Sequence, residues 1–168
     1  MNKLFLLLIS GILWFGAVNA QSDIVSAEIS FVFVSKDVEG TIGGFTSASA
    51  IDLEQLLNSQ FKGAVLVEDL RTGNFLRDWS LKSSKYFDAD EYPEILFEST
   101  EIIEKDDEFV VSGQLSIKNV SRKTSIIFRR EGNRLIGTTA IYSSDFGIDI
   151  KKKREDNLVE VKLILTLE

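Results

Sequence analysis

Two absences from the composition limit the chemistry available to this chain. The 168 residues include no His and no Cys, so a Ser-His-Asp triad, a thiol nucleophile, a disulfide and a His/Cys zinc site are all excluded. A general acid or base would have to be a carboxylate, a Lys or a Tyr. A metal ion would need carboxylate and carbonyl oxygens, which suit calcium or magnesium.

Two acidic motifs invite a metal-binding interpretation. Asp88, Asp90 and Glu91 place three carboxylates within four residues, and residues 145–147 read Asp-Phe-Gly. The first motif lacks the glycine and the distal glutamate of an EF-hand loop, which favours a solvated turn. The second has the letters of the kinase magnesium motif without its catalytic-loop and glycine-rich-loop partners, so we interpret it as a strand end with Phe146 pointing inward. We therefore expect no metal site and no cofactor.

The charged candidates have two interpretations each. Arg77 and Asp78 are adjacent and opposite in charge, so they can orient the head group of a ligand or tie a helix to a neighbouring strand. If the protein is an enzyme, Asp78, Asp145 or a Tyr would be its acid or base. The basic run 151–154 can contact anionic head groups, but the formal net charge of −7 favours a solvated hairpin tip. The same charge argues against nucleic-acid binding, which needs a clustered basic face.

The largest group of candidate binding residues is aromatic. If these residues line a cavity, they gain about 0.8 kcal/mol for each ligand CH₂ group that they bury. The alternative is an ordinary hydrophobic core. Trp79 can close one mouth of such a cavity or pack under a helix. The candidates, with Arg77 and Asp78, are Phe31, Phe33, Phe45, Phe75, Trp79, Phe87, Phe97, Phe128 and Phe146.

The elements that would position these residues are mostly strands. Apolar residues alternate with polar ones over 29–33 and 159–167, the period of a half-buried strand. Residues 52–59 predict one or two helical turns with Asp52 as a possible N-cap, and residues 74–84 predict a longer helix capped by Asn74. Gly132-Asn133 and Asp106-Asp107 mark tight turns. Further strands are predicted near 39–46, 63–70, 95–104, 109–118, 123–131 and 134–143.

These elements predict an all-β fold with a short helix. About eight mostly antiparallel strands can close into a small barrel, and a barrel of this size can hold a small ligand. A two-sheet sandwich is the alternative.

The first twenty residues have the pattern of a secretory signal. A basic start at Lys3 is followed by an apolar run over 4–15 and by small residues at Val18 and Ala20, with an apolar core too short for a comfortable membrane span. An N-terminal anchor helix is the alternative. We expect residues 1–20 to be a signal peptide, residues 21–168 to form one exported domain without a membrane span, and the protein to be periplasmic or secreted.

Several motifs occur together in a characteristic order. Residues 72–74 read Thr-Gly-Asn, followed by Arg77-Asp78, Leu-Lys-Ser at 81–83, Phe-Asp at 87–88, Tyr-Pro at 92–93 and Phe-Glu-Ser-Thr at 97–100. Residues 113–118 read Gly-Gln-Leu-Ser-Ile-Lys, and residues 144–148 read Ser-Asp-Phe-Gly-Ile. This ordered set resembles the YceI-like family of lipid-binding proteins over residues 29–168.

The resemblance implies an eight-stranded antiparallel lipocalin-like barrel, usually exported. It also implies binding of a long apolar molecule such as an isoprenoid or a related amphiphile. The chain departs from the family pattern in two polar places: Trp79-Ser80 replaces Glu-His after Arg77-Asp78, and Ser143 stands where an Arg often precedes Ser-Asp-Phe-Gly.

Three functional hypotheses follow. The first is a non-catalytic, monomeric or dimeric barrel that sequesters or carries a long-chain apolar ligand. The second is an enzyme acting on a similar lipid, for which a carboxylate with a strongly raised pKa inside the cavity would be the mark. The third is an interaction module whose interior is filled by its own side chains.

Overall fold

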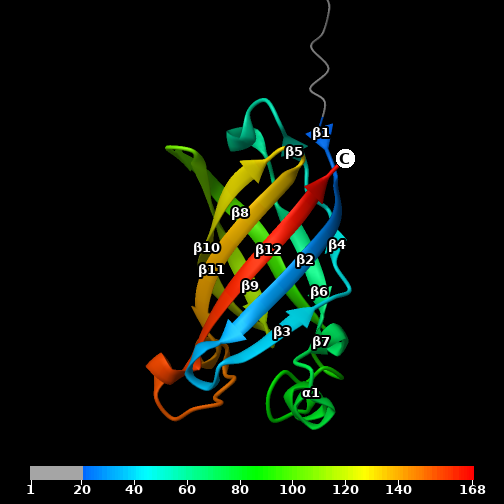
Figure 1. The fold of residues 1–168 in the computed structure, drawn as a ribbon, viewed down its shortest axis with the longest axis vertical. Helices are drawn as coiled ribbons and strands as arrows, with labels where there is room; N and C mark the ends of the chain where they lie inside the picture. The colour runs from blue at the N-terminus through cyan, green and yellow to red at the C-terminus, as the bar shows by residue number, and fades with distance from the viewer. Residues whose placement is uncertain (1–20) are drawn as a thin grey trace, which may run out of the picture.

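The computed structural model describes residues 21–168, and it is mostly β with one short helix, α1 (Figure 1). The predicted signal peptide lies outside the described residues. The strands are β1 (Gln21–Ser22), β2 (Ile24–Phe33), β3 (Val38–Ile42), β4 (Thr46–Ser47), β5 (Ile51–Asp52), β6 (Lys62–Leu66), β7 (Leu70–Arg71), β8 (Glu94–Lys105), β9 (Glu108–Ile117), β10 (Val120–Glu131), β11 (Arg134–Tyr142) and β12 (Leu158–Leu167). The helix α1 is Phe75–Lys82, and the 3₁₀ turns are η1 (Val34–Lys36), η2 (Leu56–Asn58), η3 (Val67–Asp69), η4 (Ser143–Phe146) and η5 (Arg154–Asn157).

Ten strands pair antiparallel in one curled sheet, in the order β4-β6-β8-β9-β10-β11-β12-β2-β3-β7, and β1 pairs with β5 separately. The long hairpins follow the predicted turns, because Asp106 (φ 55°) and Gly132 (φ 63°) both adopt the left-handed conformation that reverses the chain. Along β12, Glu160 and Lys162 are exposed while Leu165 and Leu167 are buried. The period-two pattern in the sequence therefore does place one face of the sheet inward.

The predicted number of eight strands is not confirmed. Residues 39–46 divide into β3 and β4 because the chain bends at Gly43-Gly44, where Gly44 has a positive φ of 65°. Residues 63–70 likewise divide into β6 and β7 around the turn η3. The bend at Gly43 contacts the segment that follows β6, since Leu66 N donates to Gly43 O (3.0 Å) and Gly43 N donates to Asp69 O (3.3 Å). The additional strands are thus two-residue segments created by bends.

The helix and the turn before β6 form where the sequence predicts helical structure. The Asn74 side chain accepts a hydrogen bond from Arg77 N (3.0 Å) and so caps α1. The Asp52 carboxylate accepts from Glu54 N (3.0 Å) and Gln55 N (2.9 Å). That carboxylate stabilises the turn leading into η2, which remains a single 3₁₀ turn.

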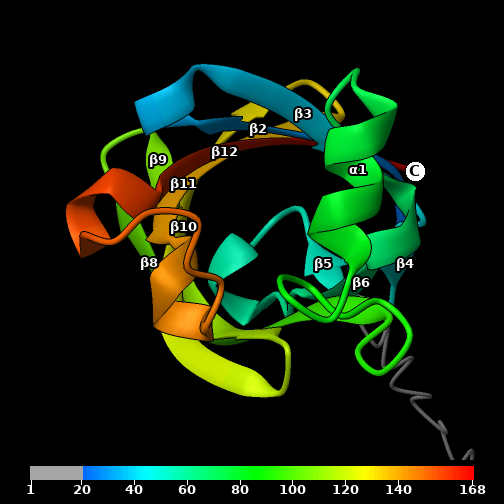
Figure 2. The same ribbon diagram turned by 90° about the horizontal axis from the view of Figure 1, so that it is seen from below.

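The two ends of the curled sheet differ (Figures 1 and 2). We call the end with β1, β5 and the C-terminus the β5 end, and the end with α1, η4 and η5 the α1 end. The main core cluster lies at the β5 end and comprises Ile24, Ile51, Phe61, Val111, Ile126, Phe128, Leu135, Leu165 and Leu167. A smaller cluster of Ile117, Phe146 and Ile148 lies at the α1 end. The space between the two clusters is the candidate site.

Candidate functional site

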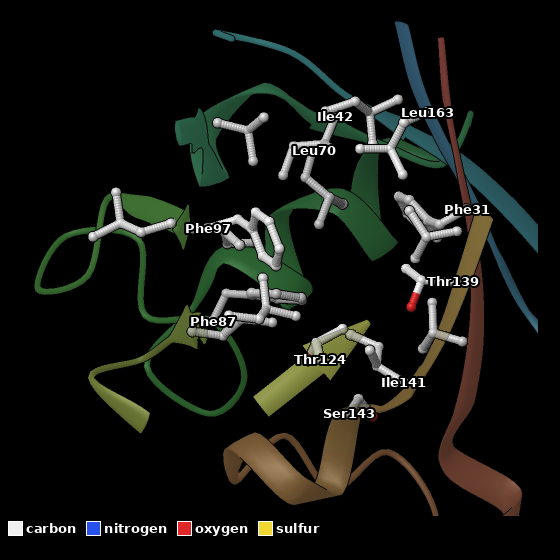
Figure 3. A pocket seen from close by; sticks show the side chains of 18 of the residues that line it. Phe31, Ile42, Leu70, Phe87, Phe97, Thr124, Thr139, Ile141, Ser143 and Leu163 are labelled. Carbon is white, nitrogen blue, oxygen red and sulfur yellow. The ribbon is translucent and has the colours of Figure 1, made fainter. Parts of the chain in front are cut away.

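A cavity of about 470 Å³ runs through the interior of the curled sheet. Strands from around the whole sheet contribute to its wall, and α1 contributes Arg77, Ser80 and Leu81 at one end. Figure 3 shows side chains such as Phe31, Phe97, Ile141 and Leu163 gathered around this space. The volume falls within the ~300–1,000 Å³ typical of small-molecule sites.

Strand alternation explains why the wall is apolar. On β2, Ile29, Phe31 and Phe33 are two residues apart and all line the cavity. On β12, the residues Val159, Val161, Leu163 and Leu165 do the same. Since successive side chains of a strand point to opposite faces, one inward residue fixes all the others.

Glycines in neighbouring strands keep phenylalanine rings against the wall. Phe31 lies directly opposite Gly40, and Phe128 lies directly opposite Gly137. A Cβ atom added at either glycine would collide with the facing ring. Each ring therefore lies over the glycine backbone instead of extending into the interior, an arrangement known from glycine–aromatic pairs in sheets. This packing helps to leave the cavity open despite the number of aromatic residues.

Most of the candidate residues named from the sequence border the cavity. One charged member of that set, Arg77, also borders it. The aromatic members that line the cavity are Phe31, Phe33, Phe45, Phe87, Phe97 and Phe128.

Four candidates lie elsewhere. Phe75 and Trp79 project from the outer face of α1, with 80% and 69% of their surface exposed. Helical periodicity explains this position, because Phe75 and Trp79 are four residues apart and share one side of the helix, whereas Arg77, Ser80 and Leu81 turn towards the cavity. Phe146 is 2% exposed and packs in the small cluster with Ile117 and Ile148. Asp78 is buried (8% exposed) outside the cavity wall.

Arg77 and Asp78 both bind Thr72, the residue after β7. Asp78 Oδ1 accepts hydrogen bonds from Thr72 N (2.8 Å) and from the Thr72 hydroxyl. Arg77 Nε donates to Thr72 Oγ1 (2.7 Å), and its Nη2 donates to Thr72 O (3.0 Å). The pair thus ties α1 to the sheet, which was one of its two interpretations. Arg77 also borders the cavity.

The charged residues at the cavity are all cationic. Among the lining residues these are Lys36, Lys62 and Arg77, and the described lining contains no Asp or Glu. Lys62 is neutralised by Glu98 at 3.1 Å on the outer surface. Positive charge next to the cavity therefore comes mainly from Lys36 in η1 and from Arg77 in α1.

Two hydroxyl groups of the wall donate hydrogen bonds to backbone carbonyl groups. Thr139 Oγ1 donates to Ser125 O (2.8 Å), and Ser143 Oγ donates to Ile148 O (2.8 Å). Figure 3 shows Thr139 and Ser143 at the border of the cavity. With their protons committed to carbonyl groups, these side chains offer few donors to a ligand.

Asp145, a candidate acid or base, is held in an ion pair away from the cavity. Arg154 donates two hydrogen bonds to its carboxylate, at 2.7 and 2.6 Å. The hydrogen bond from Arg154 lowers the pKa of Asp145 below its ordinary value, although partial burial opposes the shift. The Arg154 guanidinium also lies 3.7 Å from the centre of the Tyr142 ring. A general acid in a lipid site would need the opposite pKa shift.

The acidic motif after α1 forms a turn. Asp88 has a positive φ of 54°, and its N donates to Ser83 O at 2.9 Å. Within residues 21–168, no group of three or more Asp or Glu side chains converges to hold a metal ion. No helix in the same part of the chain has the length and apolarity needed to cross a bilayer.

The aliphatic and cationic residues of the wall are not among the candidates predicted from the sequence. Ile29 and Leu163 lie in predicted strands but are not predicted to bind a ligand, and Lys36 lies in the turn after β2. The aliphatic residues could have been found by extending each strand's inward face. Lys36 could not be predicted in this way, because it lies in a turn, where strand alternation does not apply. Only the curl of the sheet brings it to the cavity. The remaining members in this class include Ile42, Leu70, Ile95, Leu115, Ile117, Ile126 and Ile141.

Solved structures with the same fold share little sequence with this chain. BcnA from Burkholderia cenocepacia superposes with a TM-score of 0.75 at 19% identity, covering 88% of this chain and 99% of BcnA. A Campylobacter jejuni YceI protein gives 0.66 at 15% identity, covering 100% and 98%. A polyisoprenoid binding domain from Saccharophagus degradans gives 0.61 at 14% identity, covering 88% and 97%. At these identities the likeness shows the fold.

Two sequence comparisons address the family. The UPF0312 protein plu2095 of Photorhabdus laumondii is 29% identical over 83 residues, which are 49% of this chain and 43% of that protein. The aligned segment thus spans less than half of this curated relative. The YceI-like domain matches residues 17–168, nearly the whole chain. This protein belongs to the YceI-like domain family.

Proposed function

We propose that this protein is an exported binding protein that sequesters or carries a long-chain apolar ligand, such as an isoprenoid or a similar amphiphile, without catalysis. The observation that carries the proposal is the cavity of about 470 Å³ enclosed by inward-facing Phe, Ile, Leu and Val side chains. The solved relative from Saccharophagus degradans is itself described as a polyisoprenoid binding domain.

The driving force is burial of the ligand's hydrocarbon. Each CH₂ group removed from water contributes about 0.8 kcal/mol. Phe31, Phe97 and Leu163 come from three different strands around the wall, so a chain threaded between them contacts the protein on several sides.

The ligand's polar end belongs at the α1 end. Arg77 borders the cavity there while two of its nitrogen atoms are fixed on Thr72. The hydrocarbon then extends towards the β5 end, where the main core cluster closes the interior. Arg77 and Lys36 give the polar end a cationic environment, and Asp78 acts by positioning α1.

The curled sheet acts as a closed barrel in this proposal. The hydrogen bond from Leu66 N to Gly43 O joins the end of β6 to the residue that follows β3. Counting β3 and β4 as one bent strand and setting aside β7 gives eight principal strands. Closure leaves no exposed sheet edge and encloses the ligand.

Native mass spectrometry with organic extraction tests the proposal. The full chain is expressed with its first twenty residues, purified from the exported fraction and measured with and without solvent extraction. We expect a cleaved N-terminus and an extra mass that extracts as a long-chain amphiphile. A protein that carries no extra mass and takes up none of a panel of isoprenoids and fatty acids would contradict the binding function.

A further inference from the structure

The outer face of α1 is the most apolar exposed feature of the described chain. Phe75, Leu76 and Trp79 have 80%, 73% and 69% of their surface exposed. They occupy neighbouring positions on one side of the helix, because residues three and four apart lie together. The only buried residue of α1 is Asp78, which binds Thr72. The helix therefore presents Phe75, Leu76 and Trp79 to the outside, and its buried attachment to the sheet is the polar contact between Asp78 and Thr72. Exposed Trp, Phe and Leu on a short amphipathic helix are typical of an element that lies in the interface of a lipid bilayer.

The size of the face argues against a stable protein partner. An eight-residue helix is roughly 12 Å long. An aromatic side chain covers about 150–250 Å² when it is fully buried. With 80%, 73% and 69% of the three side chains exposed, the face offers roughly 330–560 Å² even when Leu76 is counted as an aromatic residue. This area is below the ~600 Å² per partner at the lower end of specific interfaces. A lipid surface has no such minimum, because side chains enter it singly and without shape complementarity.

The exposed apolar face lies on the same helix as residues that border the cavity. Arg77, Ser80 and Leu81 on the inner side of α1 border the cavity, and the apolar face lies on the opposite side of the same helix. Figure 2 shows α1 lying across part of this end of the barrel. A helix inserted in a bilayer would place the mouth of the cavity at the lipid surface, so that an insoluble ligand need not cross water.

We propose that Phe75, Leu76 and Trp79 dock the α1 end of the barrel on a lipid bilayer. The docking stands on the exposed face itself, whereas its role in ligand transfer rests on the proposed function. Insertion is driven by apolar burial, so it needs no anionic lipid and withstands salt, in agreement with the chain's net charge of −7.

Fluorescence of Trp79 tests the proposal directly. The chain contains two tryptophans, Trp14 and Trp79, so Trp14→Phe leaves one reporter on α1. With phosphatidylcholine vesicles we expect a blue shift of its emission and strong quenching when the acyl chains are brominated. An emission spectrum that vesicles leave unchanged would overturn the proposal.

A matched pair of triple variants separates this face from other exposed apolar residues. Phe75→Ser/Leu76→Ser/Trp79→Ser removes the face, and Val25→Ser/Ile103→Ser/Ile127→Ser removes exposed residues of the sheet that are outside the lining of the main cavity and are 59%, 50% and 42% exposed. In vesicle flotation at 0.5 M NaCl, we expect at least tenfold weaker binding for the first variant and less than twofold for the second. The first twenty residues are common to both proteins, so any binding through them cancels.

Three outcomes distinguish the hypotheses. Equal flotation of both variants overturns docking through α1, and so does a dimer that the α1 variant alone dissociates, since the face would then contact a second copy. Flotation that is lost only in the α1 variant supports docking. If that result occurs in a protein that takes up no amphiphile, docking stands and the proposed function fails.

Discussion

The two ends of the curled sheet are held by different kinds of interaction. At the β5 end, Ile51 is fully buried and the rings of Phe61 and Phe128 stack with their centres 5.3 Å apart. At the α1 end, the helix buries a carboxylate and exposes Phe75 and Trp79. Apolar burial contributes most to stability, whereas hydrogen bonds contribute modestly and fix geometry. The difference indicates that the β5 end contributes more to the stability of the fold, whereas α1 is held in place at the other end by hydrogen bonds to Thr72.

The largest effect on stability is expected from Phe128→Ala. Phe128 is 2% exposed and stacks on Phe61, so truncation removes apolar contacts and leaves a void. We expect the free energy of unfolding to fall by about 3–5 kcal/mol, measured by urea denaturation. A loss below about 1 kcal/mol would mean that the β5 end does not carry the stability.

A smaller but more specific effect is expected from Gly137→Ala. The added methyl group would meet the Phe128 ring and push it into the cavity. We expect about 1–3 kcal/mol of destabilisation and reduced ligand occupancy in native mass spectrometry. In the double variant with Phe128→Ala the methyl group has room, so the two losses should fall short of additivity by about 0.5–3 kcal/mol. Strict additivity would show that the ring does not depend on the glycine.

These two residues also show what the sequence reveals and what it hides. Phe128 was a candidate because aromatic residues on alternating strands predict an interior, and the structure places it on the cavity wall. The role of Gly137 could not be seen, because it depends on the register that sets it opposite Phe128. A shift of one residue between the strands would have turned the pair apart.

The features of α1 could also be predicted only in part from the sequence. The N-cap Asn74 and the extent of α1 follow from local sequence, and both are confirmed within two residues. Phe75 and Trp79 are predicted to line the cavity as members of the aromatic set, with packing under the helix as the alternative for Trp79, but both are exposed. Here the hydrogen bonds from Asp78 and Arg77 to Thr72 determine which face of α1 is buried. The spacing of apolar residues along the helix contains no information on these hydrogen bonds.

The polar attachment of α1 can be tested with Asp78→Ala. This change leaves Thr72 N without its partner at a site where Thr72 is 9% exposed. We expect a loss of about 1–3 kcal/mol in the free energy of unfolding and faster amide hydrogen exchange in α1. Asp78→Asn keeps an acceptor oxygen and should lose less. If the two variants behave alike, the negative charge matters more than the hydrogen bonds.

A pH-dependent contribution is expected from Asp145 and Arg154, which join η4 to η5. Because the folded pKa of Asp145 is lowered, the pair stabilises the protein above the ordinary carboxylate pKa of 3.8 and loses this effect as the pH falls below it. Arg154→Gln should therefore lower the unfolding midpoint slightly at pH 6, and the difference from the parent protein should shrink as the pH falls below 3.8. The effect is expected to be smaller than that of Asp78→Ala, since the pair is near the surface. A difference that grows on acidification would contradict this account.

The smallest effect on stability is expected from Trp79→Ser, although a large aromatic residue is removed. Trp79 is 69% exposed in the folded protein, so little apolar burial is lost, and Trp and Ser have similar helix propensities. We expect the free energy of unfolding to change by no more than about 0.5 kcal/mol, by the same urea assay used for Phe128→Ala. A loss of several kcal/mol would mean that Trp79 packs against the barrel in solution, and the contrast between the two ends would disappear. If the stability is unchanged, Trp79 does not contribute to folding. Its exposed ring is then available for the contact with a lipid bilayer that we propose.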